Sequence, residues 1–229
     1  QIVAGSREVM VSGGMESMTN APYLLKKGRG GYRMGHDKVF DHMMLDGLED
    51  AYEAGRSMGT FGEDCAAKYQ FTREQQDAFA IASVTRAQQA IESGAFKAEI
   101  TPVTFQTRKG EVTIDQDEGP LKIRTDKIPT LRPAFKKDGT ITAAASSSIN
   151  DGAAALVLMR QSTAQQLGCT PLAKIVAHAT HAQAPEWFTT APVGATEKAL
   201  KKAGWKVEDV DLWEINEAFA VVPMALMAD

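Results

Sequence analysis

The chain has 229 residues, of which 44% are hydrophobic and 24% are charged, and its formal net charge is −4. This length and composition are typical of a globular protein with one large or two smaller domains. The acidic balance argues against nucleic acid as a partner, and no apolar run reaches the roughly 20 residues that would span a membrane. The first residues also lack the basic and apolar regions of a signal peptide.

The number and spacing of the cysteines and histidines indicate the redox compartment and the absence of a predicted metal site. The two cysteines, Cys65 and Cys169, have no CxxC spacing, which argues against a disulfide framework and against a thiolate metal site. This pattern fits a reducing compartment, and we expect a cytoplasmic protein. The four histidines lack metal-ligand spacing, and His178 and His181 would face opposite sides of an extended segment, so the sequence predicts no metal site.

The first part of the chain consists of a strand followed by a long irregular region. Val9–Ser12 reads as a short buried strand that ends at Gly13-Gly14, where glycine permits a turn or a close backbone approach. Residues 20–60 are loop-rich, with a short helical piece over Met43–Tyr52. We therefore expect a long insertion after the first strand.

The clearest helix runs from Thr72 to Gly94. Thr72 and Gln75 form a capping-box pattern at its start, apolar residues follow at helical spacing, and Gly94 supplies the stop. The segments Ile100–Phe105 and Glu111–Ile114 then read as two strands around a glycine-containing turn.

After about residue 140, strands alternate with helices. Ala153–Met159 is apolar throughout, which predicts a strand buried on both faces, as central strands of parallel sheets are. The other expected elements are strands at Leu172–Ala177 and Val210–Ile215 and helices at Ser162–Leu167 and Gly194–Ala203. The last helix starts at Glu217 and kinks at Pro223, or it starts near Val222. This alternation favours an α/β fold with a mostly parallel sheet.

Five separated motifs follow one another along the chain. They are Gly13-Gly14-Met15-Glu16-Ser17-Met18, Met58-Gly59-Thr60, Leu131-Arg132-Pro133-Ala134-Phe135, Asn150-Asp151-Gly152-Ala153-Ala154 and Asn216-Glu217-Ala218-Phe219-Ala220. In this order and with these separations they resemble the thiolase family, and the resemblance extends over essentially the whole chain. Within the family, the chain is most similar to bacterial acetyl-CoA acetyltransferases.

The resemblance implies a thiolase-like layered αβαβα fold, incomplete in this chain, with an inserted loop domain. Residues 1–19 would be the end of the N-terminal thiolase half, residues 20–135 the loop domain that covers the substrate, and residues 136–229 the beginning of the C-terminal half. Thiolases take coenzyme A and acyl-CoA as substrates and hold no permanently bound cofactor. The resemblance also implies a role in fatty acid metabolism and a homo-oligomer, either a tetramer or a dimer of dimers.

The same resemblance implies that the main reacting groups lie outside this sequence. Thiolases use a cysteine nucleophile upstream of the first motif, and a histidine and a second cysteine downstream of the last. Those motifs are absent here, and we interpret Cys65 and Cys169 as structural or incidental because an active thiol needs an electropositive setting. Glu63-Asp64 just before Cys65 predicts a raised thiol pKa instead. We therefore expect an internal segment of a longer thiolase.

Asn216 is the catalytic residue that the resemblance carries over. Its amide would hold a water in an oxyanion hole without bringing a charge, and the alternative is an asparagine that caps the following helix. Glu217 is interpreted as structural. The implied coenzyme A-binding residues are Met58, Phe135, Ala143, Ser147, Ala218 and Phe219. For Ser147 the alternative is a solvated loop serine, and for the apolar residues it is ordinary core.

Two features of the sequence do not determine how the substrate is recognised. Ser57 stands where many short-chain thiolases have a histidine, so the motif does not fix the acyl chain length. The basic residues Arg29, Arg33, Lys122 and Arg124 are candidates for contacts with nucleotide phosphates, with a solvated charged face as the alternative.

The activity that the resemblance implies is cleavage of acetoacetyl-CoA or another 3-ketoacyl-CoA by coenzyme A, or the reverse condensation, through an acyl-cysteine intermediate. Two alternatives stay open. One is a non-catalytic coenzyme A-binding or interaction fragment, and the other is a condensing enzyme of the ketoacyl synthase type.

Overall fold

The computed structural model describes residues 1–229, and the chain forms two compact units. The first unit comprises Gln1–Met58, Ile149–His181 and Gly194–Leu212, and the second comprises Gly59–Ser148, Ala182–Val193 and Trp213–Asp229. Both units are therefore built from segments that are far apart in the sequence. None of the helices is long and apolar enough to cross a membrane.

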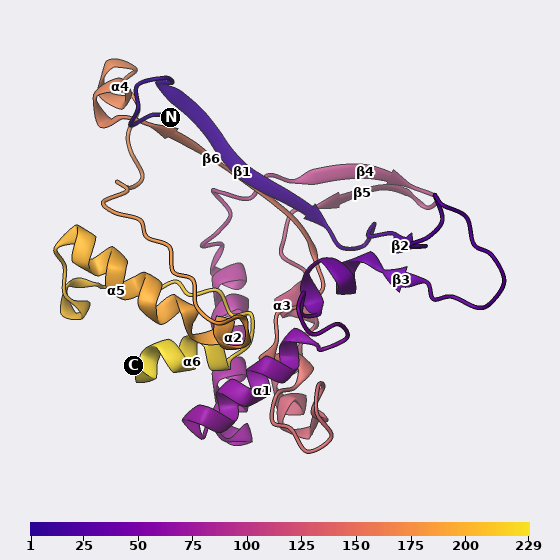
Figure 1. Cartoon of the computed structure of the whole chain (residues 1–229). Helices are drawn as coiled ribbons and strands as arrows, with labels where there is room; N and C mark the ends of the chain where they lie inside the picture. The colour runs from indigo at the N-terminus through magenta and orange to yellow at the C-terminus, as the bar shows by residue number, and fades with distance from the viewer. The chain divides into compact units, whose positions relative to one another are not determined.

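The main feature of the first unit is a long two-stranded ribbon. Strand β1 (Val9–Ser17) pairs antiparallel with β6 (Asp151–Met159), in a register that puts Val9 opposite Met159 and Ser17 opposite Asp151 (Figure 1). The strand continues through Gly13-Gly14, so the expected end at this pair is wrong and the expected close approach is found. A Cβ on Gly13 would lie 2.1 Å from the carbonyl oxygen of Ala154, so only glycine lets the strands pair at this distance.

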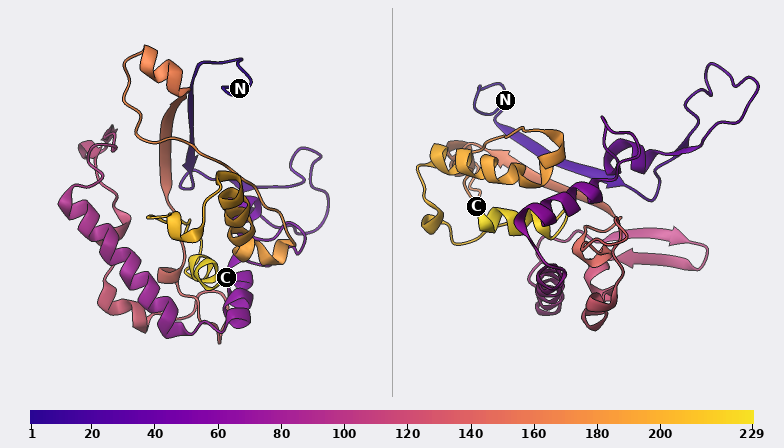
Figure 2. Two further views of the ribbon diagram at one scale, coloured as in Figure 1. Left: turned by 90° about the vertical axis from the view of Figure 1, so that its left-hand side faces the viewer. Right: turned by 60° about the horizontal axis from the view of Figure 1, so that its bottom comes forward.

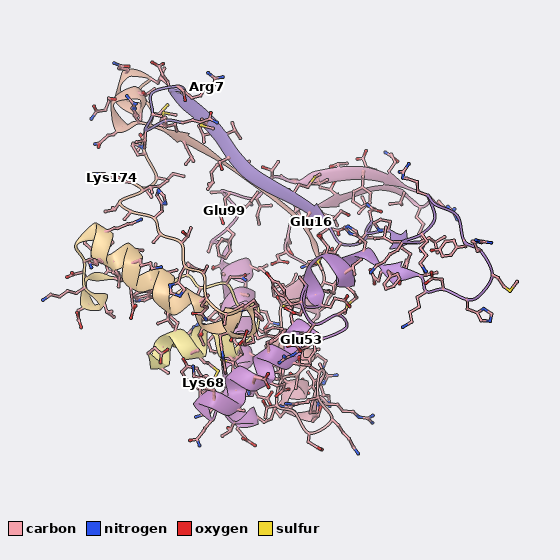
Figure 3. All side chains as sticks on the ribbon, viewed as in Figure 1. Arg7, Glu16, Glu53, Lys68, Glu99 and Lys174 are labelled. Atoms are coloured by element: carbon pink, nitrogen blue, oxygen red, sulfur yellow. The ribbon has the colours of Figure 1, made fainter.

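The ribbon also corrects two expectations about the sheet. All three sheets of the chain are two-stranded and antiparallel, not mostly parallel. Strand β6 was expected to be buried on both faces, yet Leu156 and Val157 are 64% and 63% exposed. The apolar run has the composition of a buried strand, but within its sheet it pairs only with β1. Figure 3 shows the side chains of this ribbon, including Glu16 on β1.

The other elements of the first unit are short. They are β2 (Tyr23–Leu24) and β3 (Phe40–Asp41), which pair with each other, the π-helix η1 (Met44–Leu48), α4 (Gln161–Gln166), α5 (Ala191–Ala203, whose first three residues belong to the second unit) and η5 (Val207–Asp209). The expected strands at Leu172–Ala177 and Val210–Ile215 are absent. A strand forms only with a hydrogen-bonded neighbour, and these segments have none in the chain.

The second unit is organised around helices. They are α1 (Met58–Tyr69, whose first residue belongs to the first unit), α2 (Arg73–Ser93), α3 (Gly119–Lys122), the 3-10 helices η2 (Thr125–Thr130), η3 (Ala143–Ala145) and η4 (Pro185–Thr190), and α6 (Val221–Ala228). The hairpin of β4 (Val103–Thr107) and β5 (Gly110–Ile114) completes the unit. Figure 2 shows α2 as a long, straight helix, and α3 and η2 contact it.

The local signals in this unit are confirmed. Thr72 caps α2 with the complete capping box to Gln75, and Gly94 ends the helix with a φ of 71°, in the left-handed region that favours glycine. Helix α6 begins at Val221, so the alternative of a start near Val222 is right and Pro223 lies in the first turn, where its missing N–H costs nothing.

Candidate functional site

Two aromatic rings form the centre of the candidate site in the second unit. Phe135 and Phe219 pack edge to face, with ring centroids 5.6 Å apart and an interplanar angle of 86°. Gly59 of α1 leaves room for the first ring, since a Cβ at this position would lie 2.2 Å from the Phe135 ring. Phe219 is buried and Phe135 is half-buried, so the pair joins the core to the surface of the unit.

Backbone hydrogen bonds hold the loop 143–147 against residues 218–220. The amide of Ser147 donates to the carbonyl oxygen of Ala218 at 3.1 Å, and the Ser147 Oγ donates to the same oxygen at 3.2 Å. One step further along, the Ala220 amide donates to the carbonyl oxygen of Ala145 at 2.9 Å. The structure therefore brings Ser147, from the loop before the fourth motif, together with Ala218 and Phe219 of the fifth motif.

Asn216 and Glu217 stand on the exposed stretch just before this contact. Glu217 accepts a hydrogen bond of 2.8 Å from the Ser83 hydroxyl on α2, which is consistent with a structural role. Helix α6 begins five residues after Asn216, so the asparagine is not its N-cap, and the capping alternative is wrong. The Asn216 side chain thus remains a polar group on the exposed approach to the site.

The remaining predicted binding residues are placed as follows. Ala143 is exposed at the start of η3, and Met58 is half-buried at the start of α1. Lys122 forms an ion pair of 3.3 Å with Glu118, and Arg124 forms one of 2.9 Å with Asp126. These two basic side chains therefore already meet carboxylates, which favours the solvated charged face for them.

A buried carboxylate supports the site, and sequence reasoning missed it. Glu63 of α1 is 5% exposed and accepts hydrogen bonds from the amides of Thr140 and Ile141 and from the Thr140 hydroxyl, at 2.9 to 3.1 Å. The usable signal was an acidic residue among the apolar and small residues of a helix, between Phe61-Gly62 and Cys65-Ala66. A charged side chain in such a run needs buried partners.

The two cysteines differ in their surroundings. Cys65 is fully buried, and burial raises the pKa of its thiol. The direction agrees with the expectation, but the main cause is desolvation and not the neighbouring acids Glu63 and Asp64. Cys169 is exposed after α4. No group of three or more His, Cys, Asp or Glu side chains could hold a metal ion.

Comparison with known proteins identifies the family. The family model described as "Thiolase, N-terminal domain" matches residues 1–162, and "Thiolase, C-terminal domain" matches residues 169–229. The chain belongs to the thiolase family, as the motifs predicted.

Similar proteins are named as acetyl-CoA acetyltransferases. A probable acetyl-CoA acetyltransferase of Dictyostelium discoideum is 49% identical over 98% of this chain, which covers 54% of that protein. An acetyl-CoA acetyltransferase of Rhizobium meliloti is 48% identical over the whole chain, which covers 58% of it. The chain thus spans a little over half the length of these relatives.

A solved structure has the same fold. The crystal structure of the Bacillus anthracis acetyl-CoA acetyltransferase superposes with a TM-score of 0.93 at 41% identity, over all of this chain and 58% of that one. The thiolase-like α/β fold expected from the motifs is therefore confirmed.

Proposed function

We propose that the chain is part of an acetyl-CoA C-acyltransferase of the thiolase type. The complete protein cleaves or forms acetoacetyl-CoA or another 3-ketoacyl-CoA through an acyl-cysteine, which divides one difficult carbon–carbon step into two easier ones. Coenzyme A and acyl-CoA are its substrates, and it needs no permanently bound cofactor. Family membership supports this proposal. The observation that carries it to this chain is the hydrogen-bonded contact of Ser147 with Ala218 beside the Phe135–Phe219 pair.

In this proposal the second unit supplies part of the substrate-binding surface. Phe135, Ala218 and Phe219 offer apolar area to the pantetheine arm, and the small Ala143 leaves room for it. Ser147 offers a hydroxyl to an amide of that arm, and Met58, the first residue of α1, is proposed to add apolar surface. The domain division at residues 19 and 135 belongs to the same proposal.

Asn216 is proposed to orient a water that stabilises the oxyanion of the reacting thioester, because an amide donates a hydrogen bond without placing a charge beside the substrate. The nucleophile is proposed to be neither Cys65 nor Cys169, since burial raises the pKa of the Cys65 thiol and Cys169 stands in none of the five family motifs.

The test is thiolysis of acetoacetyl-CoA by the complete gene product with free coenzyme A, combined with mass analysis of the enzyme after exposure to acetyl-CoA. We expect acetyl-CoA to form and one cysteine other than Cys65 and Cys169 to become acetylated. A protein that cleaves no 3-ketoacyl-CoA and forms no acetyl-cysteine would contradict the proposal. A series of longer 3-ketoacyl-CoA substrates then fixes the chain-length preference that Ser57 leaves open.

Replacing Asn216 tests its assigned role. Asn216→Ala should lower kcat by about 10² to 10³-fold, the usual cost of losing one oxyanion-hole donor, with a smaller change in KM. The control is Asn20→Ala, which removes an exposed asparagine whose amide bonds Ser17 in the first unit. Equal kcat values for the two variants would remove Asn216 from the reaction.

A non-catalytic coenzyme A-binding role remains the second candidate, because the motifs that carry the cysteine nucleophile, the histidine and the second cysteine of thiolases are absent from this sequence. Calorimetric titration of the 229-residue chain with coenzyme A separates the two. Binding without thiolysis by the complete protein would favour the second candidate, and thiolysis would exclude it.

Assembly and location are proposed from the family alone. We propose a homo-oligomer, a tetramer or dimer of dimers, acting in the fatty acid metabolism of the cytoplasm. Sedimentation of the complete protein as a monomer would contradict the first part of this proposal, and fractionation of the source cells tests the second.

A further inference from the structure

The buried carboxylate of Glu63 closes a hairpin that carries two of the proposed binding segments. Pro133 and Thr142 form an antiparallel bridge, and the Ala134 amide donates to the carbonyl oxygen of Ile141 at 2.9 Å. Residues 133–142 therefore fold back on themselves, and we call them the 133–142 hairpin. Phe135 lies on its first arm, and its second arm leads directly into Ala143.

Glu63 holds the second arm of this hairpin by both of its oxygens. Oε1 accepts from the amides of Thr140 and Ile141 at 3.0 and 2.9 Å, and Oε2 accepts from the Thr140 amide and hydroxyl at 2.9 and 3.1 Å. The Thr140 hydroxyl in turn accepts from Nε2 of the fully buried Gln76 at 2.8 Å. Two helices, α1 and α2, are thus tied to one turn.

The Glu63 carboxylate lies so close to the backbone of residue 139 that only glycine fits at this position. A Cβ on Gly139 would lie 2.2 Å from Oε1 and 2.7 Å from Cδ of Glu63. The carboxylate has little freedom to move away, because it is 5% exposed and engaged by three donor groups. Gly139 and Glu63 therefore form a matched pair.

The hydrogen bonds continue from the hairpin to residues 143–147, which we call the binding loop. The Thr142 carbonyl oxygen accepts from the Ala145 amide at 3.1 Å and from the Ser146 hydroxyl at 2.9 Å. Ala145 and Ser147 in turn bond Ala220 and Ala218. A series of hydrogen bonds thus connects the end of the hairpin with Ser147 and with residues 218–220.

We infer that Glu63 is a positioning residue for the coenzyme A-binding surface, acting through the 133–142 hairpin on Phe135 and Ser147. The inference rests on the binding role proposed for those residues. Glu63 touches no substrate in this role. A carboxylate suits the position because it accepts every bond offered, and bonds to a charged acceptor are the stronger ones. A glutamine presents an N–H₂ toward one of these donors and leaves it buried without a partner.

Hydrogen exchange on the complete protein tests the inference without relying on activity. In Glu63→Gln, the amides of Thr140 and Ile141 should exchange about tenfold faster or more, and the amides of Ala145, Ser147 and Ala220 should follow. Gly139→Ala keeps the carboxylate and should give the same pattern by pushing it aside. The control is Gln88→Ala, which removes a half-buried side chain of α2 that bonds the carbonyl oxygens of Pro120 and Ile123, away from the hairpin.

Faster exchange confined to Thr140 and Ile141, or an equal change at Ser147 in Gln88→Ala, overturns the inference. Either result would mean that Glu63 stabilises the fold without positioning the binding loop.

Steady-state kinetics provides the second readout. Glu63→Gln should raise KM for coenzyme A by about tenfold with kcat changed less, Glu63→Asp should lie between it and wild type, and Gln88→Ala should leave both constants unchanged. Combined with Ser147→Ala, the KM effects should be non-additive, because both changes act on one contact. Additive effects, or an unchanged KM in Glu63→Gln, contradict the inference. Lack of thiolysis by the wild-type protein would instead contradict the proposed function, and the exchange experiment would still decide the role of Glu63.

Discussion

The two units differ in how they bury apolar surface. In the second unit, thirteen apolar side chains from α1, α2, η2, α6 and the segments between them form a shared core, whereas Ala164 is the only one buried in the first unit. The first unit instead exposes the apolar residues of its ribbon, with Val11 71% and Met15 83% exposed. The β1–β6 pair is therefore held mainly by its ladder of backbone hydrogen bonds, whereas the second unit has a packed apolar core.

This difference explains why the candidate site is best defined in the second unit. A binding surface needs supports that do not move, and buried side chains with satisfied polar groups supply them. Glu63 is buried there beside the core, and both of its carboxylate oxygens accept hydrogen bonds. In the first unit only Asp50 is a buried charged group, and its carboxylate bonds the amides of the next turn, Tyr52 and Glu53.

The largest expected effect separates a core position from an exposed one of the same residue type. Ile128→Ala, at a side chain 1% exposed in η2, should lower the free energy of unfolding by about 2–5 kcal/mol. Ile175→Ala, at a side chain 68% exposed in the first unit, should change it by less than about 0.5 kcal/mol. Urea unfolding of the two variants checks this, and equal losses would mean that Ile175 is covered in the complete protein.

The two cysteines offer a second comparison between the units. Cys169 is exposed in the first unit, and Cys65 is fully buried in the second with a raised thiol pKa caused by desolvation. A thiol reagent should modify Cys169 at least about 100-fold faster than Cys65, because Cys65 reacts only after the unit opens. Peptide mapping by mass spectrometry after timed labelling measures both rates. Similar rates would show that the second unit opens readily.

Substitutions at the adjacent residues Gly13 and Gly14 test the close contact between Gly13 of β1 and the Ala154 backbone of β6. Gly13→Ala places a Cβ against the Ala154 backbone and should destabilise the pairing of β1 with β6 by about 1–3 kcal/mol. Gly14→Ala meets nothing within 4 Å and should cost less than about 0.5 kcal/mol. Amide exchange along β6 distinguishes the two variants, and the pair is closely matched because the positions are adjacent. Equal protection in both would mean that the strands separate freely.

The smallest effect is a pH dependence in the second unit. Desolvation, together with a hydrogen bond of 2.7 Å to Asp229, raises the pKa of Tyr69 from 10.0 to about 12. The neutral phenol is favoured in the folded state, so this stabilisation is complete below pH 10 and is lost as the pH rises toward 12. Unfolding measured across this range should show a steeper loss for wild type than for Tyr69→Phe. Parallel curves for the two proteins would contradict the assignment.

The sequence predicted those elements whose determinants are local. The capping box at Thr72, the αL stop at Gly94 and the β4–β5 turn all act over a few residues, and the structure has each of them. The parallel sheet was predicted wrongly, because strand direction depends on which segments pair. Val9 pairs with Met159, which lies far away in the sequence, and no local sequence pattern encodes a pairing between such distant segments.

For the candidate site, the motifs named residues but not their supports. The structure brings Ser147 to Ala218 and Phe135 to Phe219, although the binding role of these residues is still a prediction. Glu63 was overlooked because its partners are mostly backbone amides, which have no signature in side-chain patterns. The direction of the Cys65 pKa shift was expected, but its main cause, burial, depends on packing that a sequence does not display.

The pairing of β1 with β6 has a consequence for synthesis of the protein. Its strands are the ends of a loop that contains every residue from 18 to 150, and translation adds about 5–20 residues per second. Strand β1 therefore leaves the ribosome on the order of ten seconds before its partner exists. During that interval its backbone N–H and C=O groups have no partner in β6, and its apolar side chains, Val9, Val11 and Met15 among them, are exposed. Such a segment can pair with another chain and aggregate. Slowing translation between residues 18 and 150 should prolong that exposure and lower the yield of folded protein.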